Sequence, residues 1–189
     1  MEDLRLCPFA TPDGKLHTAP LYRLLLAAQG PSTPIAKFVW KNHAFFASLL
    51  VQGRIQTRDN LLKKHIVDSA CCEVCGRAPE TATHIMFECP FAAAFWHSLG
   101  FDVHGATTAA LDRIHRPGHV PTQSFETLVL LCCWQLWKRR NGIIFRGEDM
   151  TQRQVLIACK TDADLWRHRI RSKDRVVCDR WCTLFSMAM

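Results

Sequence analysis

The sequence predicts a mostly helical protein, and three observations support this fold class. Apolar residues recur at intervals of three and four over several segments, a spacing that places side chains on one face of a helix. Glycine and proline interrupt these segments where helices would end. Hydrophobic residues make up 48% and charged residues 22% of the 189 positions, so the chain can form a packed core. This length suits one domain, or a small core with a satellite, and excludes a complete polymerase.

The N-terminal part is expected to contain a leader and two helices. Residues 1–20 carry three prolines and a glycine, which predicts a loosely structured leader. A short helix is expected over residues 21–29, where Gly30-Pro31 ends the pattern. A long amphipathic helix is expected over residues 35–53, with a glycine stop. Its aromatic side chains are expected in the core: Phe38, Trp40, Phe45 and Phe46.

Further along the chain, capping residues and prolines set the expected elements. Thr57 is suited to cap a helix that reaches about His65, because its hydroxyl can accept a hydrogen bond from the next turn. Pro90 suits the first turn of another helix. Helices are also expected over residues 124–141 and 151–170, followed by an apolar tail that must dock on the body, pair with another chain or stay exposed. The expected organisation is a leader (1–20), a helical domain (21–100), a surface loop (101–123) and a C-terminal helical pair with the tail (124–189).

The chain has ten cysteines, which is an unusually high number. No secretion signal is predicted at the N-terminus. The longest apolar run, Leu128 to Trp134, has seven residues, against the roughly 20 needed to cross a bilayer. We therefore expect a nuclear or cytoplasmic protein without membrane contact. Clustered cysteines in such a reducing compartment indicate metal or redox chemistry rather than disulfides.

The cysteine cluster has the ligand spacing of a zinc site. Residues 72–89 contain Cys-x2-Cys, eight residues, and then His-x4-Cys. Zinc takes four ligands, and a Cys-x2-Cys turn supplies two thiolates. A glycine after the second cysteine permits the positive backbone torsion of such a turn. Four protein ligands leave no open position, so one structural zinc ion is expected, inserted into the helical domain as a CCHC knuckle. The assigned ligands are Cys72, Cys75, His84 and Cys89.

Alternatives exist for the same segment. Cys71 could replace Cys72, but a Cys-x3-Cys spacing would lose the preferred turn. The residues could also be buried thiols beside a neutral core histidine. Zinc deaminase chemistry requires a His-x-Glu that the chain lacks, and thioredoxin-like chemistry requires a strand and helix context. Glu80 is expected to hydrogen-bond to the backbone of the knuckle or to His84.

The positive charge is concentrated near the C-terminus. Lys138 to Arg180 contains twelve Lys and Arg against six Asp and Glu, so this stretch carries about +6 of the net +7. It could contact nucleic acid phosphates, or it could be a solvated helix face whose long stems cover apolar surface. Trp134 and Trp137 are expected in the core, with residues 138–140 continuing into solvent. The candidate phosphate contacts are Lys138, Arg139, Arg140, Arg146, Arg153, Arg167, Arg169 and Arg171.

Several motifs together resemble one known family. They are Lys37-Phe38-x-Trp40, Gly53 to Leu61, Cys72-x2-Cys75, Glu80-Thr81, His84, Phe87, Cys89-Pro90 and Trp96. The order and spacing are similar to the zinc-binding domain downstream of the polymerase in plant non-LTR (LINE-type) retroelement reverse transcriptases. Trp134 to Asn141 and Phe145 are similar to a helix that often follows in plant copies.

The resemblance implies a module derived from a retroelement. Reverse transcription needs adjacent carboxylates, typically in a Tyr-x-Asp-Asp hairpin, whereas Tyr22 is the only tyrosine and no two aspartates are adjacent. We therefore expect an isolated or domesticated, non-catalytic module without a small-molecule substrate, which binds RNA or DNA through its basic C-terminal half. The alternative is a protein-interaction or regulatory module that binds a protein partner through residues 151–170 and the apolar tail Trp181 to Met189.

Overall fold

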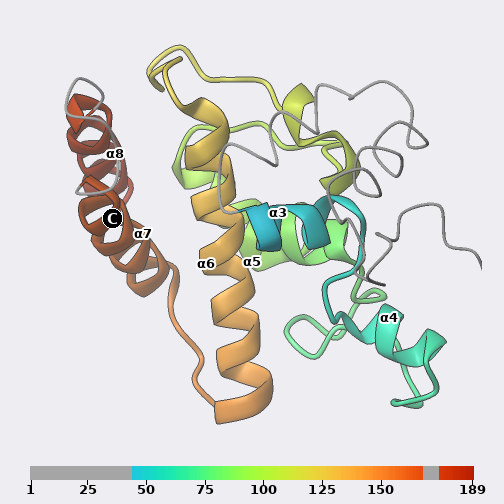
Figure 1. Ribbon diagram of the computed structural model, residues 1–189. Coiled ribbons are helices and arrows are strands. Elements are labelled where there is room, and N and C mark those ends of the chain that lie inside the picture. The colour runs from blue at the N-terminus through green and yellow to red at the C-terminus, as the bar shows by residue number, and fades with distance from the viewer. Residues whose placement is uncertain (1–43, 168–174) are drawn as a thin grey trace, which may run out of the picture. The chain divides into compact units, whose positions relative to one another are not determined.

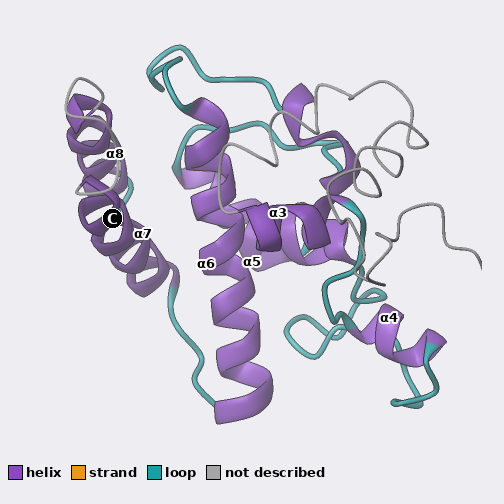
Figure 2. Ribbon diagram, in the orientation of Figure 1, coloured by secondary structure: helices purple, strands orange, loops and turns teal. Residues whose placement is uncertain are grey.

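The computed structural model describes residues 44–167 and 175–189 (Figure 1). All of them lie in one unit of the chain, Phe38–Met189. Every regular element in the described ranges is a helix, and a single β-bridge joins Cys71 to Pro79 (Figure 2). The mostly helical fold class is therefore confirmed.

Helix α3 (Ala44–Val51) is the described end of the helix expected over residues 35–53. Gly53 follows it with a φ of 63°, in keeping with the expected glycine stop. The rest of the N-terminal expectations lie outside the described residues: the leader at 1–20, the helix at 21–29, Phe38 and Trp40.

The two aromatic residues of α3 have different environments. Phe46 is half-buried, and its ring meets that of Trp134 edge-on, with the centroids 5.1 Å apart. Phe45 is 80% exposed, so its prediction as a core residue is wrong. Neighbouring helix positions point about 100° apart, and α3 turns Ala47 and Leu50 inward instead.

Helix α4 (Arg58–Lys63) begins at the predicted cap. The buried Thr57 hydroxyl accepts a hydrogen bond from the Asn60 amide at 3.3 Å. Asp59 lies in the first turn, where a negative charge favours the helix dipole. The capping role of Thr57 is therefore confirmed.

A turn of π-helix, η1 (His84–Glu88), leads directly into α5 (Pro90–Ser98). Pro90 occupies the first turn of α5 as predicted, where its missing N–H costs no hydrogen bond. The fully buried Trp96 donates its indole N–H to the Met86 carbonyl at 2.7 Å. The core therefore contains this tryptophan with its polar atom satisfied.

Residues 101–123 are more ordered than the expected surface loop. They include a short 3-10 helix, η2 (Thr108–Arg113), and they bury Phe101, Leu111 and Val120. These apolar positions are spaced too irregularly to reveal a helix in the sequence.

Helix α6 (Phe125–Arg146) contacts η1, η2 and α7 and so links the N-terminal and C-terminal parts of the described fold. It continues five residues past the predicted end at Asn141. Gly147 ends it with a φ of 66° and an amide that donates to the Gly142 and Ile143 carbonyls. No helix in the described ranges is long and apolar enough to span a membrane.

The apolar tail forms a helix that docks on its neighbour. Helix α7 (Gln152–Arg167) completes the predicted helical pair with α6, and α8 (Arg175–Met187) is an additional helix beside α7 (Figure 1). The buried side chains of this α7–α8 pair are Val155, Leu156, Cys159, Ala163, Trp166, Val177, Cys178, Trp181 and Phe185. Trp181 and Phe185 are fully buried, so neither is available to a protein partner.

Candidate metal centre

The turn between Cys72 and Cys75 is closed by backbone hydrogen bonds. The Cys72 amide donates to the Ala78 carbonyl at 2.8 Å, and the Gly76 amide donates to the Cys72 carbonyl at 2.7 Å. Gly76 has a φ of 64°, a left-handed conformation that is free of strain only without a Cβ atom. The glycine after the second cysteine therefore allows the tight turn that its position predicted.

His84 and Cys89 lie at the two ends of one π-helical turn. The Cys89 amide donates to the His84 carbonyl at 2.7 Å, an i to i+5 bond that makes a wider turn than an α-helix. Thr81 anchors this turn, since its hydroxyl accepts from the His84 amide at 3.0 Å. Side chains five positions apart can then face the same point, which explains how a His-x4-Cys spacing serves one centre.

The donor atoms of Cys72, Cys75, His84 and Cys89 all lie within 4.8 Å of one another. Cys75 Sγ is 3.3 Å from His84 Nε2. Neighbouring ligand atoms around a tetrahedral zinc ion are separated by about 3.4–3.8 Å, given Zn–S and Zn–N distances of about 2.3 and 2.0 Å. Three thiols and an imidazole also match the ligand types that zinc prefers, so the donor set fits this ion.

The Cys72 and Cys89 thiols form a hydrogen bond with each other. The hydrogen bond to Cys89, reinforced by burial, raises the pKa of the Cys72 thiol to about 12. The same hydrogen bond lowers the pKa of Cys89. A thiolate therefore forms more readily at Cys89 than at Cys72, and a cation would help to hold a second thiolate beside it.

Cys71 lies outside this cluster. It is exposed, whereas Cys72 is buried among the other donors. The chain is extended here, as the bridge to Pro79 indicates, and successive side chains of an extended chain point to opposite sides. The structure thus brings Cys72 to the candidate centre and turns Cys71 away.

Glu80 has partners that differ from those expected. Its fully buried carboxylate accepts from the Arg58 amide at 2.8 Å and from Arg140 Nη2 and Nε at 2.5 and 3.2 Å. The expectation that it would bind His84 or the knuckle backbone is wrong, because the carboxylate neutralises Arg140 instead. This buried, two-point ion pair joins residues 60 positions apart and ties the metal-binding segment to α6.

Arg139 is also buried, with 7% of its surface exposed. Its Nε donates to the Met150 carbonyl at 2.8 Å and its Nη2 to the Asp149 carboxylate at 2.5 Å. The guanidinium carbon lies 3.4 Å from the centroid of the Phe91 ring. Burial lowers the pKa of Arg139, but an arginine remains charged in proteins.

The prediction that residues 138–140 continue into solvent is therefore wrong for Arg139 and Arg140. They follow the buried Leu136 by three and four positions, which places them on its face of α6. That spacing was the sequence signal from which the burial of these two arginines could have been predicted. Arg139 and Arg140 also line, together with Cys72 and Cys89, a cavity of about 20 Å³, so both residues lie near the candidate metal ligands.

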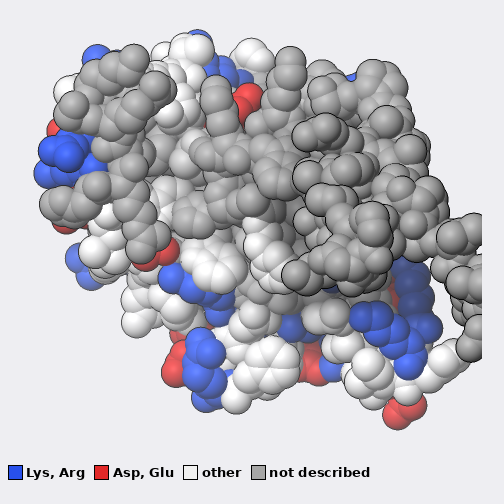
Figure 3. Space-filling view, in the orientation of Figure 1, with Lys and Arg blue, Asp and Glu red and all other residues white. Residues whose placement is uncertain are grey.

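The other predicted phosphate contacts have mixed environments. Arg153 is exposed and has no acidic partner among the described residues, whereas Arg169 and Arg171 lie outside those residues. The remaining three form ion pairs, which are Lys138–Asp162 (3.3 Å), Arg146–Glu148 (2.8 Å) and Arg167–Asp179 (2.5 Å). On the face of the molecule shown in Figure 3, several of the basic groups of the described residues likewise have acidic atoms beside them.

Comparison with known proteins supports the assignment of the metal-binding segment. Residues 17–96 match the family model described as zinc-binding in reverse transcriptase, which confirms the resemblance and includes all four candidate ligands. A putative ribonuclease H protein of Arabidopsis thaliana is 23% identical over 152 residues, which cover 72% of this chain and 24% of that protein. The chain thus spans about a quarter of this relative. No solved structure matches the chain significantly.

Proposed function

We propose that this chain, in which residues 17–96 match the zinc-binding segment of reverse transcriptases, is a non-catalytic module that one structural zinc ion stabilises and that binds RNA or DNA. The convergence of four donor atoms within 4.8 Å is the observation that carries the zinc assignment. Four protein ligands complete a tetrahedron and leave no position for water or substrate. The ion would fold the segment around it rather than perform chemistry.

The surroundings of the centre support a bound, negatively charged complex. One Zn²⁺ with three thiolates and a neutral imidazole has a net charge of about −1. Arg139 lines the same small cavity as Cys72 and Cys89, and its Asp149 partner is largely exposed, so its positive charge would help to offset that of the complex. Zinc binding and the docking of α6 would therefore stabilise each other.

The proposal that the chain lacks catalytic activity rests on its acidic residues. A nuclease or polymerase holds two divalent ions with clustered carboxylates. In the ranges that the structure describes, the Cys/His cluster is the only group of three or more potential ligands close enough to hold a metal ion. The name of the relative mentions ribonuclease H, but the chain spans only about a quarter of that protein, and we do not extend that activity to this chain.

Nucleic acid binding is proposed from charge and from the family. The chain has a formal net charge of +7, and positive charge attracts polynucleotides without regard to sequence. The family model that matches residues 17–96 describes a segment of reverse transcriptases, which are enzymes that act on RNA and DNA. That the chain is an isolated or domesticated module remains a prediction.

Salt dependence tests the nucleic acid proposal. The affinity of zinc-loaded protein for labelled RNA and DNA is measured by fluorescence anisotropy at roughly 50 and 200 mM salt, with chelator-treated protein as the control. Several phosphate contacts predict a loss of affinity of one or more orders of magnitude over this range. Absence of salt-sensitive binding by the zinc-loaded chain would eliminate the proposal and favour the protein-interaction alternative, for which exposed Ile157 and Leu165 on α7 remain available.

A further inference from the structure

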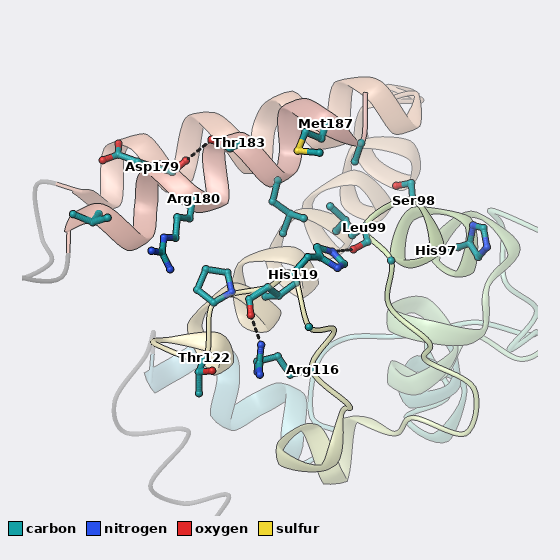
Figure 4. Close-up of a pocket in the computed structure, with 17 residues that line it drawn as sticks. His97, Ser98, Leu99, Arg116, His119, Thr122, Asp179, Arg180, Thr183 and Met187 are labelled. Atoms are coloured by element: carbon teal, nitrogen blue, oxygen red, sulfur yellow. Dashed lines mark hydrogen bonds between the residues drawn. The ribbon is translucent and has the colours of Figure 1, made fainter.

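A cleft of about 910 Å³ lies between α8, the end of α5 and residues 116–122 (Figure 4). It lies outside the segment that matches the zinc-binding family and away from the candidate metal ligands. Its lining combines basic, imidazole, hydroxyl and apolar side chains. The residues used below are Arg116, Arg180, His97, His119, Asp179 and Met187.

Positive charge predominates in the cleft. Arg180 is exposed on α8, extends toward the opposite wall in Figure 4, and has no acidic partner among the described residues. Arg116 is held in place on that wall, because its guanidinium donates to the Pro117 and Val120 carbonyls. The one acidic lining residue, Asp179, already accepts a hydrogen bond from Arg167. The two lining arginines can therefore attract an anion.

The cleft also offers flat surfaces to a ring. The His119 imidazole is fixed by contact of its Nε2 with the Leu99 carbonyl at 3.0 Å. It lies so close to Gly100 that a Cβ atom there would be 2.7 Å from its Cε1. Imidazole rings and guanidinium planes are surfaces on which the unpaired bases of single-stranded RNA stack. The exposed Met187 adds apolar surface to the same cleft.

Size favours a single strand over a duplex. Clefts of about 300–1,000 Å³ enclose ligands of drug-like size, which is comparable to one or two nucleotides. A double helix keeps its bases stacked inside and presents mainly its phosphates to a protein, so it could reach only the rim. A splayed single strand can place a phosphate between the arginines and a base against the imidazole.

We propose that this cleft is a binding site for single-stranded RNA, with Arg116 and Arg180 contacting phosphate and His119 supporting a base. The proposal rests on the proposed nucleic acid function and locates it. It assigns the contact to residues outside α6, whose buried Arg139 and Arg140 are both engaged in ion pairs.

The test uses the full zinc-loaded chain with a fluorescein-labelled oligoribonucleotide in an anisotropy assay. Arg180→Glu reverses a charge in the cleft, and Arg54→Glu makes the same change at an exposed site outside the cleft, without an acidic partner among the described residues. We expect Arg180→Glu to weaken binding by about 10-fold or more and Arg54→Glu by less than about 3-fold. The milder Arg180→Gln should lower the slope of log affinity against log salt by about 0.7.

The possible outcomes distinguish failure of the cleft proposal from failure of the proposed nucleic acid function. If the wild type binds but both charge reversals weaken binding equally, or Arg180→Glu has no effect, the cleft proposal is overturned while the nucleic acid function stands. Wild type that binds DNA but not RNA overturns the cleft proposal alone, and wild type that binds neither overturns both. Single-stranded DNA and duplex RNA of the same sequence complete the assay: weaker binding of both is expected, and duplex RNA bound as tightly as the single strand would also overturn the cleft proposal.

Discussion

The loop of residues 69–84, which holds three of the four candidate ligands, and the α7–α8 pair are stabilised by different interactions. In residues 69–84 the buried side chains are Cys72, Glu80, Ala82 and His84, so alanine is the only buried hydrocarbon. The α7–α8 pair instead buries a continuous apolar face that includes Trp166, Trp181 and Phe185. Burial of such side chains is worth about 1.5–3 kcal/mol each, a contribution that residues 69–84 lack. Zinc should therefore determine the stability of residues 69–84, and apolar packing should determine that of the α7–α8 pair.

Removal of zinc should have the largest effect and should separate the two regions. Structural zinc contributes an apparent free energy of about 10–16 kcal/mol in zinc-finger peptides, so chelation should unfold residues 69–84. The α7–α8 pair should keep helical structure. Far-UV circular dichroism and hydrogen exchange with and without chelator measure both responses. Exchange protection of residues 69–84 that survives complete metal removal would refute the role of the ion.

Trp181→Ala should have the opposite effect, destabilising the α7–α8 pair while leaving the metal centre intact. Truncation of this fully buried side chain should lower the free energy of unfolding by about 3–5 kcal/mol, while zinc content stays at that of the wild type. Trp181→Phe is the matched control and should cost less, because the indole N–H has no hydrogen-bond partner among the described residues. Urea denaturation and metal analysis test this, and zinc loss from folded Trp181→Ala protein would argue against independent regions.

Arg140→Met should weaken the connection between the metal-binding segment and α6. It leaves the buried Glu80 carboxylate without its counter-charge, which should cost up to about 3–5 kcal/mol. Adding Glu80→Gln should restore part of this loss, because a neutral amide still accepts from the Arg58 amide. A double-mutant cycle by urea denaturation measures the coupling. Strictly additive losses in the double variant would mean that the pair does not connect the two elements.

Thr57→Ala should have the smallest effect. Loss of the cap on α4 should cost about 1 kcal/mol, and Thr57→Ser, which keeps the hydroxyl, should lie closer to the wild type. Both variants should retain zinc. Equal stability of the alanine and serine variants in urea denaturation would remove the hydrogen bond as the cause.

Local features of the fold and the site were predictable from the sequence. The Thr57 cap, the Pro90 helix start and the Gly76 turn depend on neighbouring residues, and the four candidate ligands lie within 18 positions. The Glu80–Arg140 pair was not predictable, because it joins positions 60 apart that only tertiary packing brings together. Helix α8 was detectable, since Val177, Trp181 and Phe185 recur every four residues.

Zinc content in two cysteine variants tests the central claim most directly. Cys72→Ser removes a buried candidate ligand, and Cys71→Ser makes the same change one residue away at an exposed thiol. Purified wild type and Cys71→Ser should each carry about one zinc ion per chain, and Cys72→Ser should carry substantially less. Full zinc occupancy in Cys72→Ser, or loss of zinc from Cys71→Ser, would contradict the assigned centre.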